Sequence, residues 1–233
     1  KFVIDQFVMN GGKVLWFVDP LKVSRDSLFY NGRTMALDAG LNLEDLFFNY
    51  GVRMEKHLLL DTVAAPIYVP QHPKQFLEWL FYPRLKSENN HVINNNLEPV
   101  RTEYVSSLSP VGEGNIKHTT LLKSSPTSGF MRSPVRIDFQ FVVNPPRVNN
   151  DINNNGYPVA MLLEGPFNSL FKNRLTGEFT SGIQKTSFEY REEGVENQMI
   201  VVADGDVIRN DYDSTFSRGR YQYIPRPIDV DKF

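Results

Sequence analysis

The stretch "NQMIVVADGDVIRND", residues 197–211, joins an apolar strand to a group of carboxylates. Met199–Ala203 is a continuous run of strand-forming residues, and Asp204, Gly205 and Asp206 follow it directly. Carboxylates at the end of a buried strand can hold a metal ion, orient a substrate, or form the turn that ends the strand. The strand-end turn is our first interpretation and a binding site the second.

Other apolar runs in the chain show the same pattern: they are short, do not alternate with polar residues and are followed by small or acidic residues. These runs are Val14–Val18, Thr120–Leu122 and Val159–Leu163. Continuous apolar strands are buried on both faces, which is typical of parallel sheets. We therefore expect an α/β fold with a mostly parallel sheet, and irregular or antiparallel strands in the second half, where helix signals are scarce.

Two segments predict helices that pack on this sheet. In "KFVIDQFVMNGG", residues 1–12, the two glycines are expected to end a helix. Its core-facing stripe would consist of Phe2, Ile4, Phe7 and Val8. In "LNLEDLFFNYGVRM", residues 41–54, Asn42 is expected to cap a second helix that ends at Gly51.

Length and composition limit the classes of function. A chain of 233 residues can form one large domain, 1–233, or be divided into 1–85 and 86–233. A net charge of −2 supplies no basic field, so we expect no nucleic-acid partner. The absence of cysteine excludes thiol catalysis, zinc–thiolate sites and disulfides. The chain contains no run of about 18 apolar residues, which is the length needed to span a bilayer.

Ligands of parallel α/β sheets bind where loops leave the carboxyl ends of the strands. In this sequence the polar residues at those positions are Asp19, Ser124, Ser125, Glu164, Asp204 and Asp206. If they converge on one rim, they could bind a divalent cation or a sugar. Alternatively, these residues are turn formers that start the loops and have no ligand.

Motifs for catalysis and cofactor binding are weak or absent. "DINNNG", residues 151–156, matches the first half of a calcium loop, but Leu162 stands where the bidentate acid is needed. An asparagine-rich turn explains the same residues. The chain has no nucleophile elbow and no phosphate-binding glycine loop. We therefore assign no catalytic residue, no metal ligand and no cofactor.

Several segments occur in an order that resembles a known family. They are "FVIDQFVMNGGKVLWFVDP", "LNLEDLFFNYGVRM", "HVINNNL", "TTLLKSS", "VAMLLEGPFNSLFKNR" and "MIVVADGDVIRN". Their arrangement is similar to the soluble domains of the GldG group, gliding-associated ABC-transporter accessory proteins of Bacteroidetes, and to the wider family of ABC-type auxiliary domains.

The resemblance implies a Rossmann-like domain distantly related to glutamine amidotransferases. Because the amidotransferase nucleophile is a cysteine and this chain has none, it implies a scaffold without enzyme activity. It also implies an excised soluble piece of a longer protein, held at the periplasmic face of the inner membrane by helices outside this chain. Its partners would be other subunits of a membrane ABC transporter and gliding complex.

A protein partner requires exposed aromatic or arginine anchors. Phe167, Phe171 and Arg174 are candidates for this contact. The alternative is that these three residues belong to a helix packed on the sheet.

Overall fold

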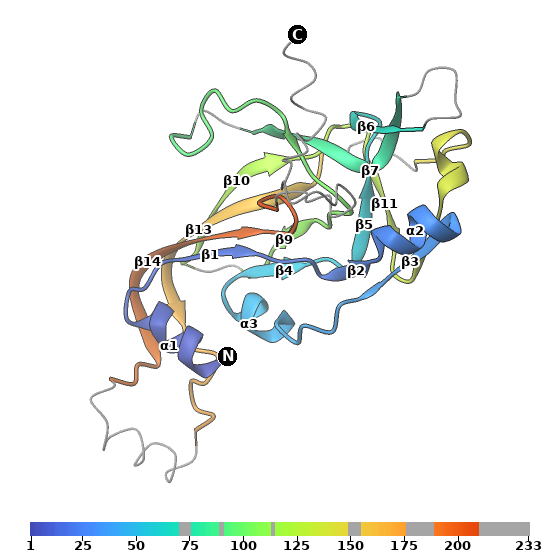
Figure 1. The fold of residues 1–233 in the computed structure, drawn as a ribbon. Helices are drawn as coiled ribbons and strands as arrows, with labels where there is room; N and C mark the ends of the chain where they lie inside the picture. Colours follow the sequence, from blue (N-terminus) through green and yellow to red (C-terminus); the bar gives the residue numbers. More distant parts are fainter. Residues whose placement is uncertain (70–75, 89–90, 113–114, 149–154, 176–188, 210–233) are drawn as a thin grey trace, which may run out of the picture.

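The computed structural model describes residues 1–69, 76–88, 91–112, 115–148, 155–175 and 189–209, which form strands and a few short helices (Figure 1). The helices are α1 (Phe2–Met9), α2 (Arg25–Asn31), α3 (Glu44–Asn49) and the 3-10 turn η1 (Phe139–Val142). The strands of the first half are β1 (Val14–Phe17), β2 (Leu21–Val23), β3 (Arg33–Asp38), β4 (Val52–Met54), β5 (His57–Leu60), β6 (Ala64–Tyr68) and β7 (Phe76–Ser87). The later strands are β8 (Val100–Arg101), β9 (Leu108–Pro110), β10 (Lys117–Lys123), β11 (Gly129–Arg132), β12 (Val135–Asp138), β13 (Pro158–Asn168) and β14 (Glu193–Val202).

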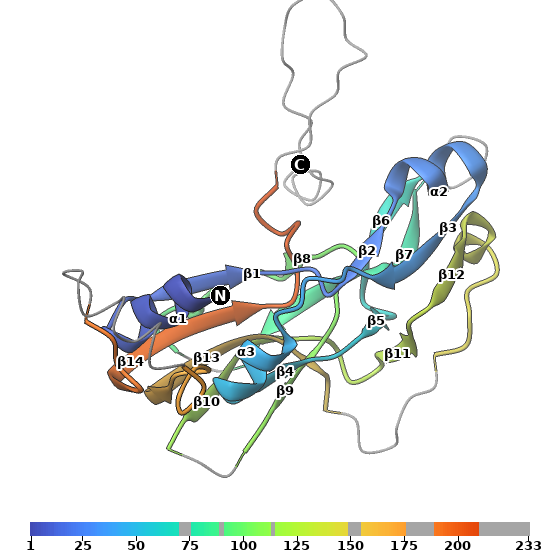
Figure 2. The same ribbon diagram turned by 90° about the horizontal axis from the view of Figure 1, so that it is seen from below.

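The main sheet has the strand order β1-β14-β13-β10-β7-β6, with β8 paired to β7. β1 is parallel to β14, and every other ladder of this sheet among the described residues is antiparallel. Three smaller antiparallel sheets complete the fold, in the orders β12-β3-β2, β11-β5 and β4-β9. Figure 2 shows β1, β14, β13 and β10 on one side of the molecule, and α2 with β3 and β12 on the other.

The expectation of a Rossmann-like, mostly parallel sheet flanked by helices is wrong. The four apolar runs do lie in adjacent strands of one sheet, but β13 runs opposite to its neighbours β14 and β10. The reason is visible in β13, where Met161 packs into one core cluster and Leu162 into another. A continuous apolar run therefore indicates that both faces of the strand are buried. It does not indicate whether the strand is parallel or antiparallel to its neighbours.

The core consists of two large clusters and a smaller one. The first joins α1, α3 and β4 to one face of β13 and β14, and the second joins β3, β5, β7 and β12. The third lies on the other face of the main sheet, around Leu121, Leu162 and Val202. Both large clusters contain residues from before and after residue 85, so neither cluster follows the division into 1–85 and 86–233.

α1 packs on the main sheet with a polar inner face, and the predicted stripe is wrong in half of its members. The buried residues of α1 are Asp5, Gln6, Val8 and Met9. Phe2 is half-buried, while Ile4 and Phe7 of the predicted stripe point outward together with Val3. The helix does end at the glycine turn, where the Gly12 N–H donates to the carbonyl of Phe7 at 2.8 Å.

The Asp5 carboxylate explains why a polar face can point into the core. It accepts hydrogen bonds from the hydroxyls of Tyr50 (3.0 Å) and Ser169 (2.6 Å), from the Leu170 N–H (2.9 Å), and from the Gln6 amide (3.1 Å). Tyr50 follows α3, and the other two distant partners follow β13. One buried carboxylate thus holds three separate segments together, because a buried charge needs such donors to offset its lost hydration.

The second helix also departs from its prediction at one end. α3 begins at Glu44 after Leu43, and Asn42 lies outside it in the left-handed region with φ of 55°. Gly51 follows the helix with φ of 90°, as expected for a glycine at a helix end.

Replacing Asp5 by Ala should lower the free energy of unfolding by about 3 kcal/mol, because the buried Tyr50 and Ser169 hydroxyls and the Leu170 N–H lose their acceptor. Asp45→Ala is the control, since Asp45 makes an exposed ion pair with Lys1 and should contribute less than about 1 kcal/mol. Denaturant unfolding of the two variants measures the difference. Equal effects would contradict the role given to Asp5.

Candidate functional site

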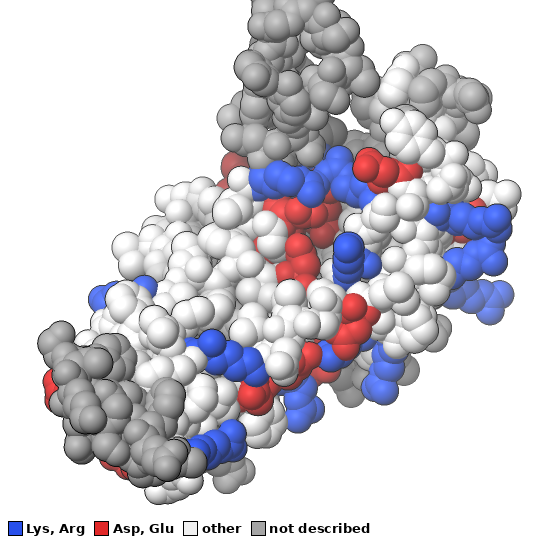
Figure 3. Space-filling model, turned by 60° about the horizontal axis from the view of Figure 1, so that its bottom comes forward, with Lys and Arg blue, Asp and Glu red and all other residues white. Residues whose placement is uncertain are grey.

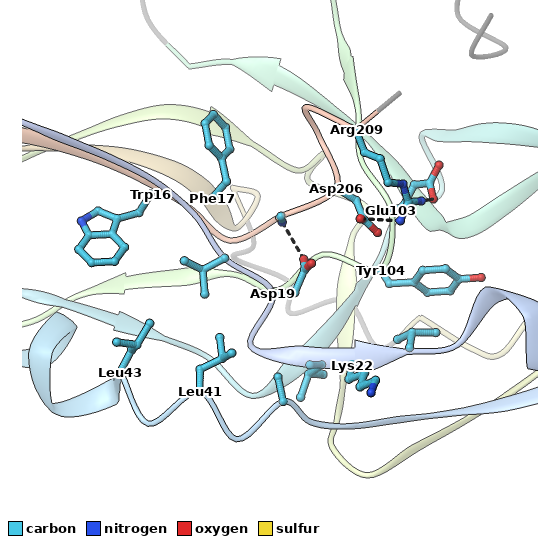
Figure 4. Close-up of a pocket in the computed structure, with 15 residues that line it drawn as sticks. Trp16, Phe17, Asp19, Lys22, Leu41, Leu43, Glu103, Tyr104, Asp206 and Arg209 are labelled. Atoms are coloured by element: carbon cyan, nitrogen blue, oxygen red, sulfur yellow. Dashed lines mark hydrogen bonds and ion pairs between the residues drawn. The ribbon is translucent and has the colours of Figure 1, made fainter. Parts of the chain in front are cut away.

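A cleft of about 650 Å³ opens at the carboxyl ends of β1 and β14 (Figure 4). One side is formed by the end of β1, β2 and the loop before α3, and the other by residues 103–104 and the turn after β14. Its lining residues are Trp16, Phe17, Val18, Asp19, Leu21, Lys22, Val23, Ala39, Leu41, Leu43, Glu103, Tyr104, Gly205, Asp206 and Arg209. Figure 3 shows acidic side chains gathered in the middle of this face, with basic side chains above them.

The parallel pairing of β1 with β14 brings Asp19 and the Asp204–Asp206 turn to the same place. The two strands are in register from Val14 opposite Met199 to Phe17 opposite Val202. Asp19 then accepts a hydrogen bond on Oδ1 from the Gly205 N–H at 2.7 Å, across 186 residues of chain. A Cβ at position 205 would stand 2.6 Å from Oδ2 of Asp19, so the close approach requires glycine.

Asp204 is a buried carboxyl with a structural role. Its Oδ1 accepts from the Asp206 N–H at 2.7 Å, and its Oδ2 accepts from the Glu103 N–H at 3.3 Å. Burial, followed by the charge of Asp19, raises the pKa of Asp204 to about 7. Burial likewise raises the pKa of Asp19, against the opposing effect of the Gly205 hydrogen bond.

Glu103 is a member of the site that the sequence did not reveal. Its carboxylate is buried and pairs with Arg101 at 2.8 Å, Arg25 at 3.0 Å and Arg209 at 3.5 Å. Arg209 also pairs with Asp206 at 2.7 Å. In the sequence, residues 100–108 alternate as an edge strand does, and the signal for a buried carboxylate is the charged pair Arg101 and Glu103 between apolar residues.

The two predicted serines lie outside the cleft and stabilise a turn. Ser125 donates to the buried carboxylate of Asp61 through its N–H at 2.7 Å and through its hydroxyl at 2.5 Å. The Ser124 hydroxyl accepts from the Tyr157 N–H at 2.8 Å. Both serines are therefore buried and already engaged with the protein.

Glu164 is separated from the other predicted acids because β13 runs in the opposite direction. It lies within β13 opposite Lys117, the first residue of β10. Its carboxylate pairs with Lys117 at 2.9 Å and accepts from the Gln198 amide at 2.8 Å. The hydrogen bond from Lys117 holds the pKa of Glu164 below its usual value.

The candidate partner residues do not form a helix. Phe167 is part of β13 and is 1% exposed, while Phe171 and Arg174 lie in the turn that follows. The Phe171 ring packs edge-on against Phe2 with centroids 5.2 Å apart, and Arg174 is exposed. The alternative of a helix packed on the sheet is therefore wrong, and the partner contact stays a prediction.

Within the ranges that the structure describes, no three His, Cys, Asp or Glu residues are arranged to hold a metal ion. Most of the "DINNNG" segment, residues 151–154, lies outside those ranges. Among the same residues, no helix is long and apolar enough to cross a membrane.

The sequence profile of a family described as "ABC-type uncharacterized transport system" matches residues 1–233. The chain belongs to this family. It is thus an auxiliary component of an ABC-type transport system. Searches of curated proteins and of solved structures give no significant match.

The raised pKa of Asp204 predicts a pH-dependent stability. The folded state favours the protonated carboxyl, so the stabilisation is complete below a pH of about 4 and is lost as the pH rises through about 7. Between pH 6.5 and 8 the free energy of unfolding of the wild type should fall by about 1 kcal/mol relative to that of Asp204→Asn.

Urea unfolding at several pH values in this range measures the effect. The range starts at 6.5 because burial lowers the pKa of His57 from 6.5 to about 4, so that most of its own titration effect lies at lower pH and the remainder is common to both proteins. A parallel fall in both proteins would assign the pH dependence to another group.

Proposed function

We propose that this chain is a non-enzymatic accessory module of a membrane ABC transporter complex linked to gliding motility and its associated secretion. It acts by protein–protein contact at the periplasmic face of the inner membrane, with other subunits of the complex as partners. Family membership supports the transport role. The gliding link rests on the segments shared with the GldG group, notably residues 2–19, 41–54 and 159–174.

The observation that carries the contact role is the outer face of α1, which consists of Val3, Ile4 and Phe7. These side chains are 73%, 40% and 54% exposed. A helix on a protein surface normally turns its apolar side inward and its polar side outward. α1 departs from this pattern, because Asp5 and Gln6 are fully buried beside Val8 and Met9 while the apolar Val3, Ile4 and Phe7 face solvent. Neighbouring exposed apolar residues mark interaction sites.

This outer face is held rigidly, which favours binding. Val3 and Phe7 are one helical turn apart and therefore adjacent. The Phe7 ring lies over Gly12, where a Cβ would stand 2.4 Å from it. On the inner side, the Asp5 hydrogen bonds fix the orientation of the helix. A partner consequently binds side chains that lose little conformational freedom.

The turn after β13 extends the same region. Phe171 supports the start of α1 through Phe2, whose ring also stacks on Tyr190 with centroids 6.1 Å apart. Arg174 lies exposed in this turn and would provide a charged contact at the rim of the interface. Phe167 is buried in β13 and would support the contact without touching the partner.

The test replaces the outer face of α1 in the intact membrane-anchored protein. Val3→Ser combined with Phe7→Ser should reduce recovery of the other transporter subunits in a pull-down from native membranes by at least about tenfold, because truncating central apolar anchors costs more than 1 kcal/mol each. Val143→Ser is the matched control, since Val143 is 60% exposed and follows η1.

Thermal unfolding of the double variant should match the wild type, because the replaced side chains make no part of the buried core. Recovery of the same subunits in the same amounts from both variants would contradict the proposed contact face.

A further inference from the structure

β1 has an unused edge that faces the cleft. It is the terminal strand of the main sheet and pairs only with β14 among the described strands. The Val18 N–H, immediately after β1, donates to the carbonyl of Val202 at 3.0 Å. Because main-chain groups alternate in direction along a strand, those of Leu15 and Phe17 point to the opposite edge. No main-chain hydrogen bond from the described residues reaches that edge.

Apolar side chains border this edge of β1. Trp16 and Phe17 line the cleft on the β1 side, and Leu41 and Leu43 line it from the loop before α3. Leu15, on the same face of β1 as Phe17, is 54% exposed, and Leu41 is 45% exposed. An extended chain lying along β1 would cover these side chains with its own apolar residues, on both faces of the extended sheet.

Asp19 is the carboxylate of the cleft that remains available for a ligand. Both oxygens of Asp204 already accept hydrogen bonds, and Glu103 and Asp206 are neutralised by arginines. Asp19 uses Oδ1 for the Gly205 N–H, and no described residue donates to its Oδ2. Figure 4 shows the Asp19 carboxylate between the apolar wall and the Arg209 side of the cleft.

We propose that this cleft binds an extended peptide segment of a partner protein, which pairs with the outer edge of β1 and places a Lys or Arg side chain on Asp19. Main-chain hydrogen bonds to a free strand edge give such complexes affinity, and side-chain pockets give them specificity. The apolar walls accept the stem of a basic side chain, while its charged head meets the carboxylate.

The same geometry disfavours a divalent cation as the ligand. Calcium takes six to eight oxygen ligands, and magnesium needs an octahedral shell. One available carboxylate oxygen leaves nearly all of either shell to water, so either ion would bind weakly. A basic side chain needs only one carboxylate, so the charge of Asp19 is matched by a single Lys or Arg of the peptide.

This site uses none of the α1 residues, so the proposal does not rest on the proposed contact through α1. The Val3→Ser, Phe7→Ser variant is expected to bind the peptide as the wild type does, which keeps failure of the two proposals distinguishable.

The experiment measures binding of a fluorescein-labelled peptide, acetyl-Val-Leu-Arg-Leu-Val-amide, to the intact protein by fluorescence anisotropy. We expect saturable binding that weakens at least tenfold in Asp19→Asn. The Asn side-chain oxygen can still accept from the Gly205 N–H, so this variant should keep its fold and its melting temperature. Glu193→Gln is the matched control, because Glu193 is exposed and pairs with Lys172 away from the cleft.

Three peptide changes test the chemistry. Citrulline in place of arginine removes the charge and should weaken binding as much as Asp19→Asn does in the protein. N-methylation of alternate main-chain nitrogens blocks strand pairing and should also weaken binding. Agmatine, a free guanidinium compound, should bind far more weakly than the peptide.

Equal binding of the arginine and citrulline peptides, or of wild type and Asp19→Asn, would overturn the role of Asp19. Binding that is unaffected by N-methylation, or agmatine binding as tight as that of the peptide, would overturn the extended-peptide assignment. The absence of saturable peptide binding at millimolar concentration would overturn both.

Discussion

The parallel pairing of β1 with β14 is the constraint on which the rest of this structure depends. It is the one parallel ladder among the described strands, and it joins the first strand of the chain to the last one described. Because both strands point the same way, the polar residues that end them, Asp19 and Asp204–Asp206, meet at one edge of the sheet. The antiparallel strands that follow in the sheet widen the core but contribute no carboxylate to the cleft. The cleft therefore exists because one pair of strands departs from the pattern of all the others.

The electrostatics around this edge follow from burial. Three arginines surround the Glu103 carboxylate, which compensates a charge that would otherwise be costly to bury. Among the described residues Asp204 has no such cation. Two main-chain N–H groups favour its charged form, but burial outweighs them, so its proton is retained to a higher pH. Asp5 uses the same means at α1, with neutral donors from three segments. In both places hydrogen bonds to a carboxyl group join parts of the chain that are far apart in the sequence.

The sequence predicted the positions of the central strands but not their directions. Met199–Ala203 and Val159–Leu163 are continuous apolar runs because both faces of β14 and β13 are buried, and that is equally true of parallel and antiparallel neighbours. The placement of Asp19 and Asp206 beside one cleft could be predicted, since both follow strands that are parallel to each other. Their binding of a ligand stays a prediction. Glu164 was placed with them only because β13 was given the wrong direction. The polar inner face of α1 was beyond prediction, because Ile4 and Phe7 are apolar whichever way the helix faces, and the donors for Asp5 lie as far away as Ser169.

The pairing of β1 with β14 has a consequence for how the protein folds. The cleft cannot form until the chain has been synthesised past residue 205, because Gly205 donates the hydrogen bond that Asp19 accepts. Contacts between such distant residues form slowly, since a long loop has to close first. During synthesis, β1 would therefore lack its partner strand, and both of its edges would be open to pairing with other chains. A chaperone that covers residues 14–17 at this stage would protect the protein from aggregation until β14 arrives.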